Sequence, residues 1–136
     1  MENEYLIKKS PWVFHLCTGG CNGCDIEILA LLSPKYDLER FGGLLKGSPK
    51  HADIILITGP LTEKSMLRAL RVYESVPNPK KVIAVGSCAI STGIFKGERI
   101  KGPADKKFKI DMYVPGCPPR PEAILAAIFE VLKTDR

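Results

Sequence analysis

The sequence predicts an α/β protein built around a mostly parallel, doubly wound sheet of four strands with helices on both faces. Three observations lead to this class. Strand-like apolar runs alternate with helical patterns, two of the runs are continuously apolar, and 136 residues are enough to bury one hydrophobic core. Neither a repeat nor a linker interrupts the alternation, so we expect residues 1–136 to form a single domain.

Four apolar runs are predicted to form the strands. The two middle runs, ADIILITG (52–59) and KVIAVG (81–86), are continuous in Val, Ile and Leu. Such runs are typical of strands that are buried on both faces of a parallel sheet. The first and last strands are predicted at WVFHL (12–16) and DMYVPG (111–116).

Helical patterns separate these strands. The first helix is predicted after Cys24 by apolar residues at helical spacing, namely Ile26, Leu29, Ala30 and Leu32. The second helix has Thr62 as its expected N-cap and carries the apolar residues Leu67, Leu70, Val72 and Tyr73. The third covers residues 123–132 and begins near Pro121, because proline is favoured in the first turn of a helix.

Two segments lie outside this pattern. Residues 1–10 are expected to be a polar N-terminal extension without a secretory signal, and residues 96–110 an irregular basic loop, either solvated or able to dock an acidic partner. The apolar segment AILAAIFEVL is too short to span a membrane. We therefore expect a soluble, cytosolic chain. Its net charge of +5, without a base-reading module, argues against nucleic acid as a partner.

The five cysteines follow predicted strands. Cys17, Cys21 and Cys24 follow the first strand, Cys88 the third and Cys117 the fourth. The carboxyl ends of parallel strands share one edge of the sheet, where ligands bind, and cytosolic cysteines favour metal or redox chemistry over disulfides. One cysteine is surplus to a four-ligand site. We expect it to be Cys17, packed near the strand end. The two-residue spacing between Cys21 and Cys24 is commoner for adjacent cluster ligands than the three-residue spacing between Cys17 and Cys21.

Cys21 and Cys24 form a C-x-x-C pair, and Cys88 and Cys117 would complete a four-cysteine set. Glycines beside these positions let the backbone approach negatively charged sulfur; they are Gly20, Gly23, Gly86 and Gly116. Four thiolates suit zinc or an iron–sulfur cluster. Zinc sites usually combine two close pairs, whereas the second two cysteines here are solitary, which favours a [4Fe–4S] cluster. A structural zinc site and a thiol redox pair remain alternatives from the residues alone.

Other side chains near the cysteines are weaker candidates. Glu27 and Asp25 are carboxylates near a helix N-terminus, which is favourable by itself, and Glu27 is a candidate proton or hydrogen-bond site. Arg120 would offset the charge of a cluster, pair across an interface or be solvated. His15 and His51 are expected to be structural. The loops ITGPLTEKS and GSCAISTG lack the G-x-x-x-x-G-K-[ST] form, so no nucleotide is expected.

The chain also resembles a known family over nearly its whole length, from about Pro11 to Leu132. The motifs that carry the resemblance are CNGCDIEI, YDLERFG, HADIILITGP, VGSCAISTG and VPGCPPRPEAI. They are similar to those of the small, cluster-bearing subunit of the group 4, energy-converting, membrane-bound [NiFe] hydrogenases and formate hydrogenlyases. The homologous subunit of respiratory complex I, which bears its terminal cluster, has a similar arrangement. The resemblance implies a flavodoxin-like fold.

The resemblance further implies one [4Fe–4S] cluster, with the ligands Cys21, Cys24, Cys88 and Cys117. It implies a large partner subunit that holds the [NiFe] centre, ferredoxin-like subunits that supply electrons, and membrane-arm subunits. The chain would be a peripheral subunit on the cytoplasmic face of the cell membrane. The segment YDLERFG, with Asp37, Arg40 and Phe41, corresponds to a region near the quinone site of complex I and suggests a contact with another subunit or the membrane arm.

Two differences from related proteins place the chain nearer to the energy-converting hydrogenases. Complex I subunits have two adjacent cysteines where this chain has Gly23 and Cys24, and periplasmic uptake hydrogenases add a cysteine-rich domain and a twin-arginine leader that are not expected here. The expected function is electron relay to a partner that reduces protons to H2 in an ion-translocating complex. The alternatives are the equivalent subunit of a sulfur or polysulfide reductase or of a complex I-type quinone oxidoreductase, and a zinc-stabilised structural subunit.

Overall fold

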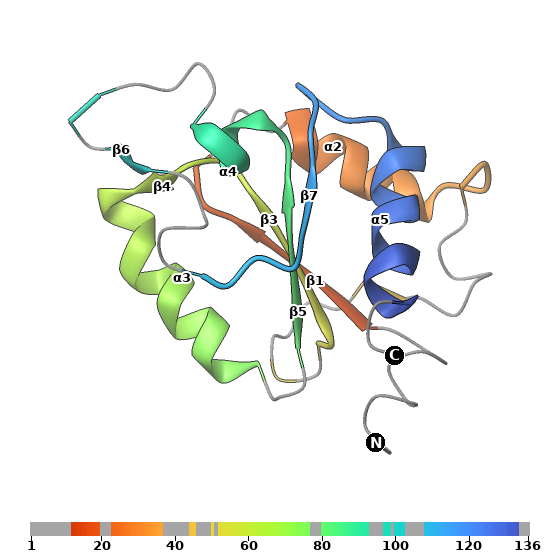
Figure 1. The fold of residues 1–136 in the computed structure, drawn as a ribbon, viewed down its shortest axis with the longest axis horizontal. Helices are drawn as coiled ribbons and strands as arrows, with labels where there is room; N and C mark the ends of the chain where they lie inside the picture. The colour runs from red at the N-terminus through yellow and green to blue at the C-terminus, as the bar shows by residue number, and fades with distance from the viewer. Residues whose placement is uncertain are drawn as a thin grey trace.

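The chain folds into three layers, with helices on both faces of a parallel sheet, as a computed structural model shows (Figure 1). The structure describes residues 12–19, 23–36, 44–45, 50, 52–76, 80–92, 97–98, 100–102 and 108–133. The strand order is β2-β1-β3-β5-β7, and all neighbouring strands in this sheet are parallel. The expected α/β class with a parallel sheet is confirmed.

Four of the five strands in this sheet are the predicted ones. The strands are β1 (Trp12–Cys17), β2 (Leu44–Leu45), β3 (Ile54–Thr58), β5 (Lys81–Val85) and β7 (Met112–Val114). The sequence pattern does not predict β2, because two residues are too few to show a strand periodicity.

The middle strands are buried on both faces, as their continuous apolar runs predict. Each side chain of residues 54–57 is 0% exposed, and residues 82–85 are at most 1% exposed. Ile54 and Leu56 enter the core beneath α2 and α5, whereas Ile55 and Ile57 enter the core beneath α3, since successive side chains of a strand point to opposite faces. These two apolar layers hold the carboxyl edge of the sheet in place.

The helices are α2 (Gly23–Leu29), α3 (Glu63–Ser75), α4 (Ser87–Ser91) and α5 (Pro121–Lys133), and the 3-10 turn η1 (Ala30–Leu32) follows α2. The expected N-cap of α3 is confirmed. Thr62 Oγ1 accepts a hydrogen bond from the Ser65 N–H at 3.1 Å, and Ser65 Oγ accepts one from the Thr62 N–H at 3.2 Å. α5 begins at Pro121, as predicted. The sequence pattern does not predict α4, which has only five residues.

The prediction for the buried face of the first helix is wrong. Ile26, Leu29 and Leu32 are 63%, 55% and 42% exposed, whereas Ile28 and Leu31 are 1% exposed. The segment from residue 26 to residue 32 is apolar at every position but Glu27, so periodicity could not select one face.

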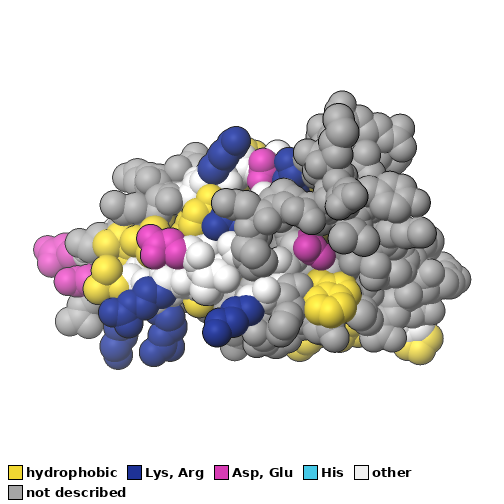
Figure 2. Space-filling model, turned by 90° about the horizontal axis from the view of Figure 1, so that it is seen from below, with side chains coloured by type: hydrophobic (Ala, Val, Ile, Leu, Met, Phe, Trp, Pro, Cys, Tyr) yellow, Lys and Arg dark blue, Asp and Glu magenta, His cyan; other side chains and the backbone are white. Residues whose placement is uncertain are grey.

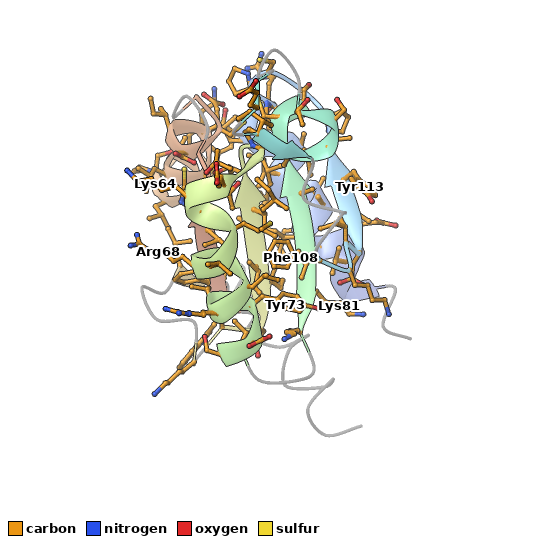
Figure 3. All side chains as sticks on the ribbon, turned by 90° about the vertical axis from the view of Figure 1, so that its left-hand side faces the viewer. Lys64, Arg68, Tyr73, Lys81, Phe108 and Tyr113 are labelled. Atoms are coloured by element: carbon orange, nitrogen blue, oxygen red, sulfur yellow. The ribbon has the colours of Figure 1, made fainter. Side chains whose placement is uncertain are left out.

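The segment 96–110 is more ordered than expected in the part that the structure describes. Residues 100–102 form β6, which pairs antiparallel with β4 (Leu61–Thr62). Phe108 is only 3% exposed, and its ring lies against Tyr73 of α3 with the centroids 5.1 Å apart (Figure 3). Residues 93–96, 99 and 103–107 lie outside the described residues, as do residues 1–10.

Basic side chains are also exposed on α3, outside the segment 96–110. Lys64, Arg68 and Arg71 are exposed on this helix, and the labelled Lys64 and Arg68 point away from the sheet (Figure 3). On the face shown in Figure 2, the described Lys and Arg side chains are spread over several places, with Asp and Glu side chains among them. Within the described residues, no helix has both the length and the hydropathy required to cross a membrane.

Asp53 connects the starts of β1 and β3. Its Oδ2 accepts a hydrogen bond from the Trp12 N–H at 3.1 Å, and its own N–H donates to the Trp12 carbonyl at 2.7 Å. Burial raises the pKa of the Asp53 carboxyl above its usual range, although the hydrogen bond from Trp12 lowers it. The folded state therefore binds this proton more tightly than the unfolded state does. The resulting contribution to stability is present at low pH and is lost as the pH rises through the folded-state pKa.

We predict that Asp53→Asn, which keeps an acceptor for Trp12, becomes more stable relative to the unsubstituted protein as the pH rises from about 3.5 to 7. The substitution removes the cost of ionising a partly buried carboxyl. Thermal unfolding of both proteins across this range measures the effect. A difference in melting temperature that does not change with pH would contradict the prediction.

Candidate functional site

A cavity of about 100 Å³ lies at the carboxyl edge of the sheet. Its lining residues come from α2 and from the segments that follow β3, β5 and β7, and they include Cys24, Cys88 and Cys117. The structure thus brings together three of the four cysteines predicted as ligands. Cys21, the fourth, lies outside the described residues.

Each of these cysteines has a different environment. Cys24 is the second residue of α2 and is half-buried, and Cys88 is the second residue of α4 and is 8% exposed. Cys117 lies in the turn after β7, is exposed and precedes Pro118 through a cis peptide bond. Of the three, Cys88 is thus the most shielded from solvent and Cys117 is accessible.

Gly86 forms part of the wall between β5 and α4. Its φ of +91° and ψ of 157° define a backbone conformation that is essentially limited to glycine. Its N–H donates to the Val114 carbonyl at 2.8 Å, which fixes it beside β7. A Cβ atom at this position would lie 2.5 Å from Cys24 Sγ, so only glycine leaves room for the thiol.

Gly116 and Gly23 are the other two predicted glycines that the structure describes at this site. Gly116 has a φ of +143°, and a Cβ there would lie 2.6 Å from Pro119 Cα. Its carbonyl accepts a hydrogen bond from the Ser87 N–H at 2.9 Å, which connects the loop after β7 to the start of α4. Gly23 is the first residue of α2 and lines the cavity. Gly20 lies outside the described residues.

Three polar side chains form a hydrogen-bonded group at the same edge. Thr58 Oγ1 donates to Asp25 Oδ1 at 2.7 Å, and His15 Nε2 lies 2.7 Å from the same oxygen and 3.1 Å from Thr58 Oγ1. Asp25 and Thr58 also line the cavity. From the sequence alone, Asp25 is a weaker candidate than Glu27, His15 is expected to be structural, and nothing singles out Thr58. The sequence does contain a signal for two of them, because His15 lies within an otherwise apolar strand and Thr58 ends another.

Thr18 is a further polar residue at this edge that the sequence pattern does not predict. It is 1% exposed, and its Oγ1 lies 2.9 to 3.0 Å from the carbonyl oxygens of Thr58, Gly59 and Pro60. Its own carbonyl accepts a hydrogen bond from Ser65 Oγ at 2.7 Å. These contacts fasten the end of β1 to the loop after β3, which helps to form the cavity wall.

The remaining predicted residues that the structure describes do not line the cavity. Glu27 is half-buried in the second turn of α2, so Asp25 is the acidic residue of the first turn. The Arg120 side chain is 76% exposed, and its Nε lies 3.3 Å from the Glu122 carboxylate. Cys17 ends β1 and is exposed, so the expectation that it is packed is wrong. His51 lies outside the described residues, and so do Asp37, Arg40 and Phe41.

The residues present fit an iron–sulfur cluster in their chemistry. The thiols of three cysteines reach one cavity from three separate segments, and a side chain at Gly86 would collide with the Cys24 sulfur. Within the described ranges, no three side chains of His, Cys, Asp or Glu are grouped to hold a single metal ion.

The fold and the cavity define an α/β protein with a cysteine-rich site at the carboxyl edge of a parallel sheet. Comparison with known families then gives a specific assignment. The chain belongs to the family described as NADH ubiquinone oxidoreductase, 20 Kd subunit, whose model matches residues 21–131. The family resemblance seen in the sequence motifs is confirmed.

Similar proteins include subunits of membrane-bound complexes. The probable membrane-bound hydrogenase subunit mbhJ of Pyrococcus furiosus is 53% identical over 128 residues, which cover 93% of this chain and 77% of that protein. Formate hydrogenlyase subunit 7 of Escherichia coli is 49% identical over 120 residues, which cover 88% of this chain and 47% of that protein. A chain in a structure of the archaeal membrane-bound sulfane sulfur reductase aligns with a TM-score of 0.84 and 38% identity, covering 98% of this chain and 74% of the other. The chain is thus similar to subunits of oxidoreductase complexes.

Proposed function

We propose that this chain is an electron-relay subunit that holds one [4Fe–4S] cluster through Cys21, Cys24, Cys88 and Cys117. The observation that carries the proposal is the meeting of three of these cysteines at one cavity, from α2, from α4 and from the turn after β7. A [4Fe–4S] cluster bound there would accept and release one electron at a time. No residue of this chain has a catalytic role in the proposal, because the reaction takes place on a partner subunit.

The protein's part is to bind and shield the cluster. The cysteine thiolates are the ligands, and Gly86 and Gly116 allow the backbone and the Cys24 sulfur to come close. Cys88 is nearly buried, whereas Cys117 is exposed. Electron exchange with a partner is therefore easiest on the side of Cys117, where little protein separates the site from the surface.

The proposed complex is a membrane-bound hydrogenase. Its large subunit would hold the [NiFe] centre and reduce protons to H2, and ferredoxin-like subunits would supply the electrons. Membrane-arm subunits would couple this reaction to ion transport, with the present chain peripheral on the cytoplasmic face. The support is the 53% identity to the hydrogenase subunit of Pyrococcus furiosus.

A second candidate is the equivalent subunit of a sulfane sulfur reductase. Its support is the structural similarity to a chain of that complex over 98% of the present sequence. Both candidates give the present chain the same electron-relay role. They differ in the reaction that the large subunit carries out.

The two candidates are separated by purifying the complex anaerobically through a tag on this chain. We expect the complex to contain nickel and to evolve H2 when supplied with reduced ferredoxin. Hydrogen is measured by gas chromatography, and sulfide release from polysulfide is measured in parallel. A nickel-free complex that releases sulfide and no H2 would overturn the hydrogenase assignment and support the sulfur reductase.

A further inference from the structure

We propose that His15, Asp25 and Thr58 hold a negative charge at the cavity wall and thereby lower the reduction potential of the cluster. This inference rests on the proposed function, because it requires a cluster in the cavity. It goes beyond that function by assigning three positioning residues that are not ligands.

The donors of the network follow from the negative charge that we propose for Asp25. The Thr58 hydroxyl donates to Asp25 Oδ1 at 2.7 Å. An ionised carboxylate only accepts hydrogen bonds, so the 2.7 Å contact of His15 Nε2 with the same oxygen assigns a hydrogen to Nε2. Asp25 Oδ1 therefore accepts two hydrogen bonds, which fix the direction of the carboxylate.

The network connects three elements to the cavity. His15 belongs to β1, Thr58 ends β3, and Asp25 lies in the first turn of α2 directly after Cys24. Any change in the position of the carboxylate would therefore also affect the turn that carries Cys24. Asp25 and Thr58 both line the cavity, so the fixed charge is part of its wall.

The charge is placed where water screens it only in part. The side chains of His15 and Asp25 are 20% and 16% exposed. In such an environment the interaction between charges is stronger than in bulk water. A carboxylate beside the cluster disfavours the addition of an electron, which lowers the reduction potential. The donors His15 and Thr58 keep the carboxylate in place and offset part of its charge.

The test is an EPR-monitored redox titration of the intact complex. Asp25→Asn is expected to raise the potential of this cluster, with up to about a tenfold change in the reduction equilibrium, which corresponds to 59 mV for one electron. Glu74→Gln is the matched control, because it removes the same charge from an exposed residue in the last turn of α3. Its potential is expected to equal that of the unsubstituted complex.

A second pair of variants separates the hydrogen bond from the packing. Thr58→Val keeps the shape of the side chain but removes the donor to Asp25, so we expect a shifted potential and altered g-values. Thr58→Ser keeps the hydroxyl and is expected to restore both. Wild-type potentials in Asp25→Asn and Thr58→Val, at full iron and sulfide content, would overturn this inference alone.

Iron and sulfide are measured in the same samples. If the variants lose the cluster, the network is required for assembly, and the proposed effect on potential is also overturned. If the unsubstituted complex has no cluster on this chain, the proposed function fails together with the inference. The outcomes are therefore distinguishable.

Discussion

Cys88→Ala is expected to remove the cluster from this chain, so that the purified complex contains about four fewer iron and four fewer sulfide ions than the unsubstituted complex. Cys88 is 8% exposed, lines the cavity and is one of its three described cysteines. Alanine has no donor atom to replace the thiolate. Colorimetric iron and acid-labile sulfide assays on anaerobically purified complex measure the loss, and electron transfer from the donor is expected to fall with it.

Cys17→Ala is the matched control for this experiment. Cys17 is exposed at the end of β1 and is the cysteine left over from the proposed ligand set. The variant is expected to keep its full iron and sulfide content. Retention of the cluster in Cys88→Ala would contradict the ligand assignment. Its loss in Cys17→Ala would place Cys17, in the C-x3-C-x2-C segment, among the ligands.

Gly86→Ala is expected to displace Cys24 and to release most of the iron bound by this chain, although no proposed ligand is substituted. The added Cβ would lie 2.5 Å from Cys24 Sγ, and the φ of +91° is strained for any residue with a side chain. The backbone strain alone is expected to cost about 1–3 kcal/mol of stability. Iron content and the thermal unfolding midpoint measure the two effects.

Gly97→Ala tests whether the effect comes from the cavity. Gly97 also has a positive φ, +159°, but among the described residues no atom beyond its chain neighbours lies within 4 Å of a Cβ placed there. This variant is expected to keep its iron. If Gly86→Ala behaves as Gly97→Ala does, Gly86 does not limit the room available to the Cys24 sulfur.

The parts of the fold that the sequence predicts well are those with a strong local signal. The continuous apolar runs of β3 and β5 are buried on both faces, and Thr62 and Pro121 mark the starts of α3 and α5. The meeting of Cys24, Cys88 and Cys117 also follows from sequence, because the carboxyl ends of parallel strands share one edge.

The parts that the sequence does not predict depend on contacts between distant segments. The strands β2, β4 and β6 have two or three residues each, and α4 has five, so none shows a periodicity of its own. The contacts of Thr58 with His15 and Asp25 depend on the register that places Cys17 opposite Thr58. The exposure of Cys17 at the end of β1 likewise depends on how other segments pack there, which no local pattern shows.

The most direct test of the central proposal is native mass spectrometry of the complex, purified anaerobically, together with a low-temperature EPR spectrum of its dithionite-reduced form. We predict that this chain is heavier than its sequence by four iron and four sulfide ions, and that the spectrum contains a reduced-cluster signal that Cys88→Ala lacks. A mass increase of one zinc ion without sulfide would contradict the relay function and would identify a structural four-cysteine site on the same α/β scaffold.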